Sequence, residues 1–122
     1  MNDRIQHLIG LSENELNLIY NKSVCLIHPS LYEGFGVPVI EAMKAKCPVL
    51  AYQCPAVNEI GLDGITYFKS YDTKSVNMLI NSMMNKENAE LTNKAYKIAD
   101  RFSWEKTGIE TINLFNKVLS TI

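Results

Sequence analysis

Short apolar runs alternate with helix-like segments along this chain, and the alternation limits the fold more than any other feature. The runs at 24–28 and 48–52 are almost uninterrupted, as is typical of strands buried on both faces of a parallel sheet. Intervening helices of about ten residues make right-handed crossovers between parallel strands. The pattern therefore predicts an α/β fold: a doubly wound parallel sheet of about four strands, with helices on both faces.

Local signals give the expected elements. Strands are expected at 5–9, 24–28, 48–52 and 65–68. Ser12 and Glu15 form a capping box that opens the first helix. Pro38 fits the first turn of a second helix, which runs to about Lys46. Further helical segments are expected at 55–60 (a turn or short helix), from Asp72 or Thr73, and on either side of 102–104, with Ser103 as an N-cap.

Length and charge exclude several classes of protein. The chain has 122 residues, 47% hydrophobic and 20% charged, with a net charge of −1. This composition excludes intrinsic disorder and indicates one domain, residues 1–122, with an expected folded surface of roughly 6,600 Å². A near-neutral charge argues against nucleic acid as a partner. The polar start and the lack of a long apolar run predict neither a signal peptide nor a membrane span.

The cysteines point to a reducing compartment. Cys25, Cys47 and Cys54 are odd in number and form no C-x-x-C pair, so neither a disulfide framework nor a zinc site is expected. We expect free thiols in a cytoplasmic protein.

One loop carries the features of a ligand site. Residues 33–41 read EGFGVPVIE and follow the run at 24–28. Ligands of open parallel sheets bind at the carboxyl ends of strands. Gly34 and Gly36 permit unusual backbone geometry and close ligand approach, and the start of the next helix favours a phosphate. Glu33 and Glu41 add carboxylates for hydroxyl groups, so a nucleotide sugar fits the pattern.

The same residues also have an ordinary interpretation. A glycine pair before a helix is common in loops, Glu33 is then a loop charge, and Glu41 is a solvated helix residue. The spacing by itself leaves both interpretations open.

The longer string decides between them by resemblance. PSLYEGFGVPVIEAM (29–43), followed by PVLA (48–51), closely resembles the signature of the group 1 (family 4) retaining glycosyltransferases of GT-B fold, whose hallmark is two glutamates separated by seven residues. Upstream, residues 9–20 resemble the family's strand-glycine and helix; downstream, 58–60 and 102–105 resemble its Pro-Glu-Val/Ile and Phe-Ser-Trp elements. The resemblance covers about residues 4 to 120 and implies the latter part of a C-terminal, Rossmann-like donor-binding domain.

The resemblance also implies roles for individual residues. Glu33 would contact hydroxyls of the transferred sugar and stabilise the oxocarbenium-like transition state, and Glu41 would bind the nucleotide ribose. The backbone of four consecutive residues would hold the sugar and the diphosphate: Gly34, Phe35, Gly36 and Val37. The sugar is transferred with retention from a nucleoside-diphosphate donor; no cofactor or essential metal is implied, and the chain has no D-x-D.

Departures from the family pattern set further expectations. Lys46 stands where the family has a left-handed glycine, at a cost of about 1 kcal/mol or less. The family's N-terminal acceptor-binding domain has no counterpart, nor do the Arg and Lys that neutralise the diphosphate. We therefore expect a donor-binding fragment that needs its missing domain or a partner chain, does not turn over alone, and self-associates or is marginally soluble. The alternative is a non-catalytic nucleotide-sugar-binding remnant or subunit.

Four side chains or groups have weaker signals. His7 and His28 are interpreted as strand residues rather than bases, and Trp104 as a packing anchor rather than a sugar-stacking platform. Lys94, Lys97 and Arg101 form a mild basic stripe. Such a stripe is usually a solvated face, or it contacts anionic lipid beside a membrane-linked acceptor, so a membrane-peripheral location stays open.

Overall fold

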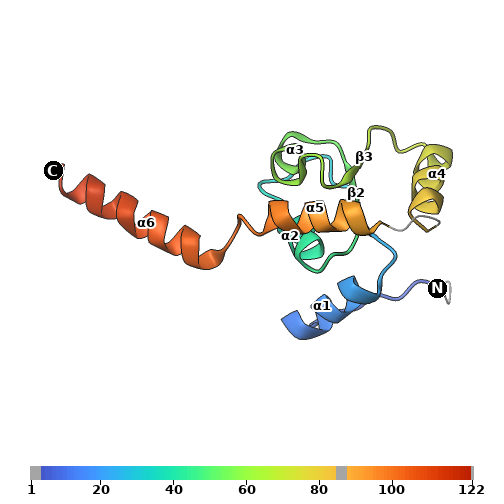
Figure 1. Cartoon of the computed structure of the whole chain (residues 1–122), viewed down its shortest axis with the longest axis horizontal. Helices are drawn as coiled ribbons and strands as arrows, with labels where there is room; N and C mark the ends of the chain where they lie inside the picture. Colours follow the sequence, from blue (N-terminus) through green and yellow to red (C-terminus); the bar gives the residue numbers. More distant parts are fainter. Residues whose placement is uncertain (1–3, 85–87, 122) are drawn as a thin grey trace.

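A computed structural model describes residues 4–84 and 88–121. Its strands are β1 (Leu26–His28), β2 (Val49–Tyr52) and β3 (Thr66–Phe68). Its helices are α1 (Glu13–Lys22), α2 (Val37–Lys44), α3 (Pro55–Gly61), α4 (Thr73–Met84), α5 (Ala89–Ala99) and α6 (Trp104–Leu119). The strands form one parallel sheet in the order β1-β2-β3 (Figure 1). The predicted α/β class with parallel strands is therefore confirmed.

Helices cover both faces of the sheet. Val49 and Ala51 face a core that includes Val39 and Met43 of α2 and Ala95 of α5. Leu50, which points to the opposite face, packs with side chains of α4 and β3: Phe68, Val76, Leu79, Ile80 and Met83. Because neighbouring residues of a strand point to opposite faces, β2 is buried on both sides, as its apolar run predicts.

The expected strand at 5–9 is wrong. This segment has no regular structure, and Ile5 and Ile9 are 66% and 80% exposed. A strand needs a neighbour for its backbone N–H and C=O groups, and β1 pairs only with β2 in the described part of the chain. Among the described residues the sheet consequently has three strands rather than about four, and His7 lies in an exposed segment rather than in a strand.

The first strand is also less buried than its sequence indicates. Val24 and Ile27 are 50% and 44% exposed. β1 lies at the edge of the sheet, and α4 packs mainly over Leu50 and Phe68 of the neighbouring strands. An apolar run therefore identified the strand but not its position at the edge.

The predicted N-caps Ser12 and Ser103 are confirmed, whereas α2 ends at Lys44 rather than at about Lys46. Ser12 and Glu15 form a reciprocal capping box at α1, and the Ser103 side chain accepts from the backbone N–H of Lys106 at α6. At the end of α2, Lys46 N–H donates to Met43 O (3.1 Å) and Cys47 N–H donates to Ala42 O (2.9 Å). This is the Schellman pattern, which needs a left-handed residue. Lys46 supplies it with φ 56°.

The last helix has little contact with the rest of the molecule. Figure 1 shows α6 extending away from the body towards the C-terminus, and all its residues are exposed. Trp104 is 82% exposed, so the interpretation as a packing anchor is wrong for this chain. The total accessible surface is 9158 Å², well above the roughly 6,600 Å² expected of a compact protein of this mass.

Candidate functional site

The glycine loop lies where a parallel sheet places its ligands, between the carboxyl end of β1 and the start of α2. Gly36 is the N-cap of α2 with φ 98°, and its carbonyl accepts from the N–H groups of Val39 and Ile40. A Cβ atom on Gly36 would stand 2.9 Å from Ile60 Cδ1. The turn into α2 therefore requires glycine at this position.

Gly34 differs from Gly36. Its φ is not in the left-handed region, so the expectation of special backbone geometry is wrong here. A Cβ atom on Gly34 would meet nothing within 4 Å. The packing of the chain gives no reason for glycine at 34, and the open space beside its backbone is available to a ligand.

Glu33 is paired with a histidine from the preceding strand. Oε1 of Glu33 lies 2.9 Å from Nε2 of His28, and the two side chains are 24% and 12% exposed. His28 is the last residue of β1, so the strand interpretation is confirmed, but the side chain also contacts the candidate site.

Glu41 has a partner of its own from α1. The Tyr20 hydroxyl donates to Glu41 Oε2 at 3.3 Å, while the Glu41 side chain is exposed. Burial of the ring, with the nearby Glu41 charge, raises the pKa of Tyr20 to about 12. The phenol is thus a permanent donor at neutral pH and holds one carboxylate oxygen at its place on α2.

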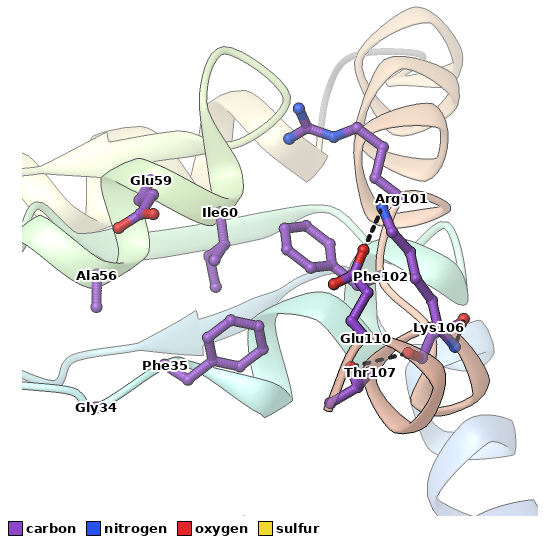
Figure 2. A pocket seen from close by; sticks show the side chains of 11 residues that line it. Gly34, Phe35, Ala56, Glu59, Ile60, Arg101, Phe102, Lys106, Thr107 and Glu110 are labelled. Atoms are coloured by element: carbon purple, nitrogen blue, oxygen red, sulfur yellow. Dashed lines mark hydrogen bonds and ion pairs between the residues drawn. The ribbon is translucent and has the colours of Figure 1, made fainter. Parts of the chain in front are cut away.

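Two cavities adjoin the loop. The larger, about 500 Å³, lies between the loop, α3 and the start of α6 (Figure 2). Its wall is formed in part by Gly34, Phe35, Glu59, Arg101, Lys106 and Glu110. Lys106 Nζ is 3.9 Å from Glu110 Oε1, so the wall carries charges of both signs.

The smaller cavity, about 190 Å³, lies over α2. It is lined by Phe35, Val37, Glu41, Lys44, Phe102 and Trp104, among others. Phe35 meets Phe102 edge-to-face with ring centroids 5.7 Å apart, and Lys44 Nζ donates to Phe102 O at 2.6 Å. The loop and α2 are thereby fastened to the connection between α5 and α6.

Comparison with known proteins matches this loop and its surroundings to one family. The sequence profile of the glycosyl transferases group 1 matches residues 1–102, which include the whole glycine loop. The chain belongs to the group 1 glycosyltransferases.

Curated relatives of this glycosyltransferase chain include enzymes for two different sugars. The O-antigen chain mannosyltransferase RfbU of Salmonella typhimurium is 39% identical over 75 residues, 62% of this chain and 21% of RfbU. The O-antigen chain mannosyltransferase B of Escherichia coli is 27% identical over 91% of this chain and 30% of its own length. The lipopolysaccharide 1,2-N-acetylglucosaminetransferase of Salmonella typhimurium is 30% identical over 79% of this chain and 27% of its own length. The chain thus spans less than a third of these relatives.

The glycosyltransferase chain brings most of its predicted site residues to one edge of the sheet. Gly34 and Phe35 line the larger cavity, and Phe35, Val37 and Glu41 line the smaller one. Glu33 lines neither of these two cavities and turns towards His28 instead. The contacts of Tyr20, His28 and Phe102 were missed by the sequence analysis, because these partners come from other elements and no local spacing connects them.

The remaining chemistry-bearing groups of the chain are less informative. The cysteines are free, and burial raises the pKa of the Cys25 and Cys47 thiols, which keeps them protonated and unreactive. In the part of the chain that the structure describes, no three His, Cys, Asp or Glu side chains gather as a metal site, and no helix has the length and apolar character to cross a bilayer.

Proposed function

We propose that this chain is the donor-binding part of a retaining glycosyltransferase of family 4, which transfers a hexosyl group from a nucleoside-diphosphate sugar. Glu33 would bind sugar hydroxyls and stabilise the transition state. The backbone from Gly34 to Val37 would hold the sugar and diphosphate, and Glu41 would bind the ribose. The observation that carries the proposal is the open backbone of Gly34 beside the start of α2, at the carboxyl end of β1.

Backbone geometry supports phosphate binding at this loop. The N–H groups of Val39 and Ile40 are already taken by the Gly36 carbonyl. N–H groups at or before the first turn of a helix have no carbonyl partner four residues back. The backbone N–H groups of residues 34–37 therefore take no part in the hydrogen bonds of α2. Together with the positive end of the α2 dipole they would favour a phosphate over a neutral group.

The carboxylates support the recognition of hydroxyl groups. The Tyr20 hydroxyl donates to one carboxylate oxygen of Glu41. The Glu41 side chain is exposed and keeps further acceptor positions for the two hydroxyls of a ribose. Glu33 is three-quarters buried, and a partly buried carboxylate makes stronger hydrogen bonds to hydroxyls than a solvated one.

For the sugar we propose mannose, because two of the relatives above are mannosyltransferases of O-antigen chains. The acceptor would then be a growing bacterial surface glycan, and the chain would work in the cytoplasm or at the membrane surface. The complete enzyme would need an acceptor-binding domain, from the same polypeptide or from a partner chain. No metal would be essential.

Nucleotide binding tests the proposal directly. We expect GDP and GDP-mannose to bind the 122-residue chain at millimolar concentration in ligand-observed NMR, more tightly than UDP and UDP-N-acetylglucosamine. Glu41→Gln should weaken GDP binding about tenfold, the loss of one charged hydrogen-bonding group. The matched control is Glu90→Gln, which removes an exposed glutamate of α5. Binding of none of the four nucleotides, or equal binding by the Glu41 and Glu90 variants, would overturn the proposal.

The alternative, a nucleotide-sugar-binding chain without turnover, gives the same binding results. The two differ in transfer: only an enzyme fragment regains transfer when an acceptor-binding domain is supplied.

A further inference from the structure

We propose that His28 is a positioning residue for Glu33. In this proposal, which rests on the proposed function, the imidazole Nε2–H holds one carboxylate oxygen of Glu33 and leaves the other for the hydroxyls of the transferred sugar. His28 itself does not touch the substrate.

The contact between the two side chains is short and shielded. Nε2 of His28 lies 2.9 Å from Oε1 of Glu33, with His28 12% and Glu33 24% exposed. The Nε2 atom is inaccessible to solvent and makes no well-aligned hydrogen bond with any described residue, so its 2.9 Å approach to Glu33 is an electrostatic contact that a small rotation of either side chain would turn into a hydrogen bond. The Glu33 carboxylate is therefore the charged group with which Nε2 interacts at short range.

The chemistry of the contact decides which ring nitrogen carries a proton. A neutral imidazole has one N–H donor and one acceptor nitrogen. An acceptor Nε2 would place its lone pair against those of a carboxylate, which is repulsive, whereas an Nε2–H is attracted to it. The 2.9 Å separation therefore favours the Nε2–H form of His28.

The position of Glu33 explains why such a partner matters. Glu33 stands in the loop after β1, immediately before the open Gly34, and its side chain has several rotatable bonds. A reacting group must be held to about 0.5 Å. His28, at the end of a hydrogen-bonded strand, is a fixed point from which the carboxylate can be held.

The competing explanation is that His28 only packs against Glu33. The two explanations differ in which ring nitrogen of His28 carries the proton. The chain has two histidines, and the exposed His7 is a built-in reference. In ¹⁵N-labelled protein at pH 8, we expect His28 to show a single tautomer protonated at Nε2 and His7 a mixture. Glu33→Ala should turn His28 into a mixture and leave His7 unchanged. A His28 ring protonated at Nδ1, or one indifferent to Glu33→Ala, would overturn the proposal.

Conservative variants give a second readout. The side-chain nitrogen of glutamine reaches the place of Nε2 and that of asparagine the place of Nδ1. We therefore expect His28→Gln to bind GDP-mannose as the unchanged chain does, and His28→Asn to bind it about fivefold to tenfold more weakly. Both should bind GDP equally, because Glu33 contacts the sugar and not the nucleotide. Equal affinity of both variants for GDP-mannose would overturn the proposal.

The two proposals can fail separately in these experiments. If the unchanged chain binds neither GDP nor GDP-mannose, the proposed function fails, and the tautomer measurement still tests whether His28 donates to Glu33. If GDP-mannose binds but His28→Asn matches His28→Gln, donor binding stands and the positioning role of His28 is overturned.

Discussion

Gly34 and Gly36 lie two residues apart, yet the molecule uses them differently. Gly36 has φ 98° and little space for a Cβ atom, while Gly34 is open. We expect Gly36→Ala to lower the free energy of unfolding by about 1–3 kcal/mol, the cost of a strained backbone position. Gly34→Ala should change it by less than about 0.5 kcal/mol, as at other open surface positions, but should weaken GDP binding. Urea titration and ligand-observed NMR of both variants check this; equal stability of the two would contradict it.

Lys46 holds a backbone conformation that a side chain disfavours. Its φ is 56°, and its Nζ lies 5.3 Å from the centre of the Tyr96 ring. Lys46→Gly should raise the free energy of unfolding by about 1 kcal/mol, because the left-handed strain exceeds an exposed cation–π contact. Lys46→Ala is the control: it keeps the strain and loses the cation, so it should be no more stable than the unchanged chain. A destabilised Lys46→Gly would show that the contact with Tyr96 dominates.

Tyr20 makes the stability of the protein sensitive to alkaline pH. Burial and the Glu41 charge raise its pKa to about 12, against an ordinary value of 10.0. The folded state thus favours the protonated phenol. The contribution of Tyr20 to the free energy of unfolding is therefore fully present below pH 10 and is lost as the pH rises through about 12. Thermal melts between pH 9 and 12 should therefore fall less steeply for Tyr20→Phe. Tyr32→Phe, at a ring that is 90% exposed, should follow the unchanged chain.

At the same scale, the sequence was sufficient for residues whose reason is local. The capping box of Ser12 and the turn at Gly36 each depend on a few neighbouring residues, and the structure has both. The left-handed position of Lys46, which the family resemblance implied, is also present. The partners of the two glutamates could not be predicted from the sequence. The Tyr20–Glu41 contact, for example, forms only when α1 packs on α2. His28 was recognised as a strand residue, but spacing gives no indication of which way its ring turns.

Among the elements, α6 contributes apolar residues without contributing to the core. Phe115 is 61% exposed and Phe68 is 5% exposed. Phe68→Ala should lower the free energy of unfolding by about 3–5 kcal/mol, whereas Phe115→Ala should change it by less than about 0.5 kcal/mol. Urea titration at micromolar concentration, where the chain is most dilute, measures both. A large loss for Phe115→Ala would mean that α6 is covered in solution.

Helices were easier to predict than strands in this chain. Caps such as Ser12 and Ser103 mark helix starts locally, whereas a strand exists only where a neighbour pairs with it. The run at 5–9 has the apolar composition of a strand but no pairing partner in the described structure, and β1 is at an edge for the same reason. Strand number and burial are therefore properties of the sheet and not of any one run.

As a whole molecule, the chain exposes more surface than a compact protein of its mass. Its accessible surface area of 9158 Å² exceeds the area expected of a compact protein of this mass by about 2,500 Å². A standard interface buries about 800 Å² per partner, so there is ample surface for one. We expect light scattering of the purified chain to show concentration-dependent self-association.

The same molecule should bind donor without transferring sugar. Holding an acceptor against the donor can supply about 7–11 kcal/mol of barrier lowering, and the proposed enzyme would need its separate acceptor-binding domain for this. Assays with GDP-mannose and a glycan acceptor should therefore give no transfer above background. Robust transfer by a monodisperse monomer would contradict both whole-molecule expectations.

The attachment of α6 has a mechanical consequence. The helix is joined to the glycine loop through Phe102, which contacts Phe35 and accepts from Lys44. A helix of 16 residues is about 24 Å long, so a 4 Å push at its free end turns it by about 10° around this pivot. A movement of α6 would therefore be transmitted through Phe102 to Phe35 of the candidate site.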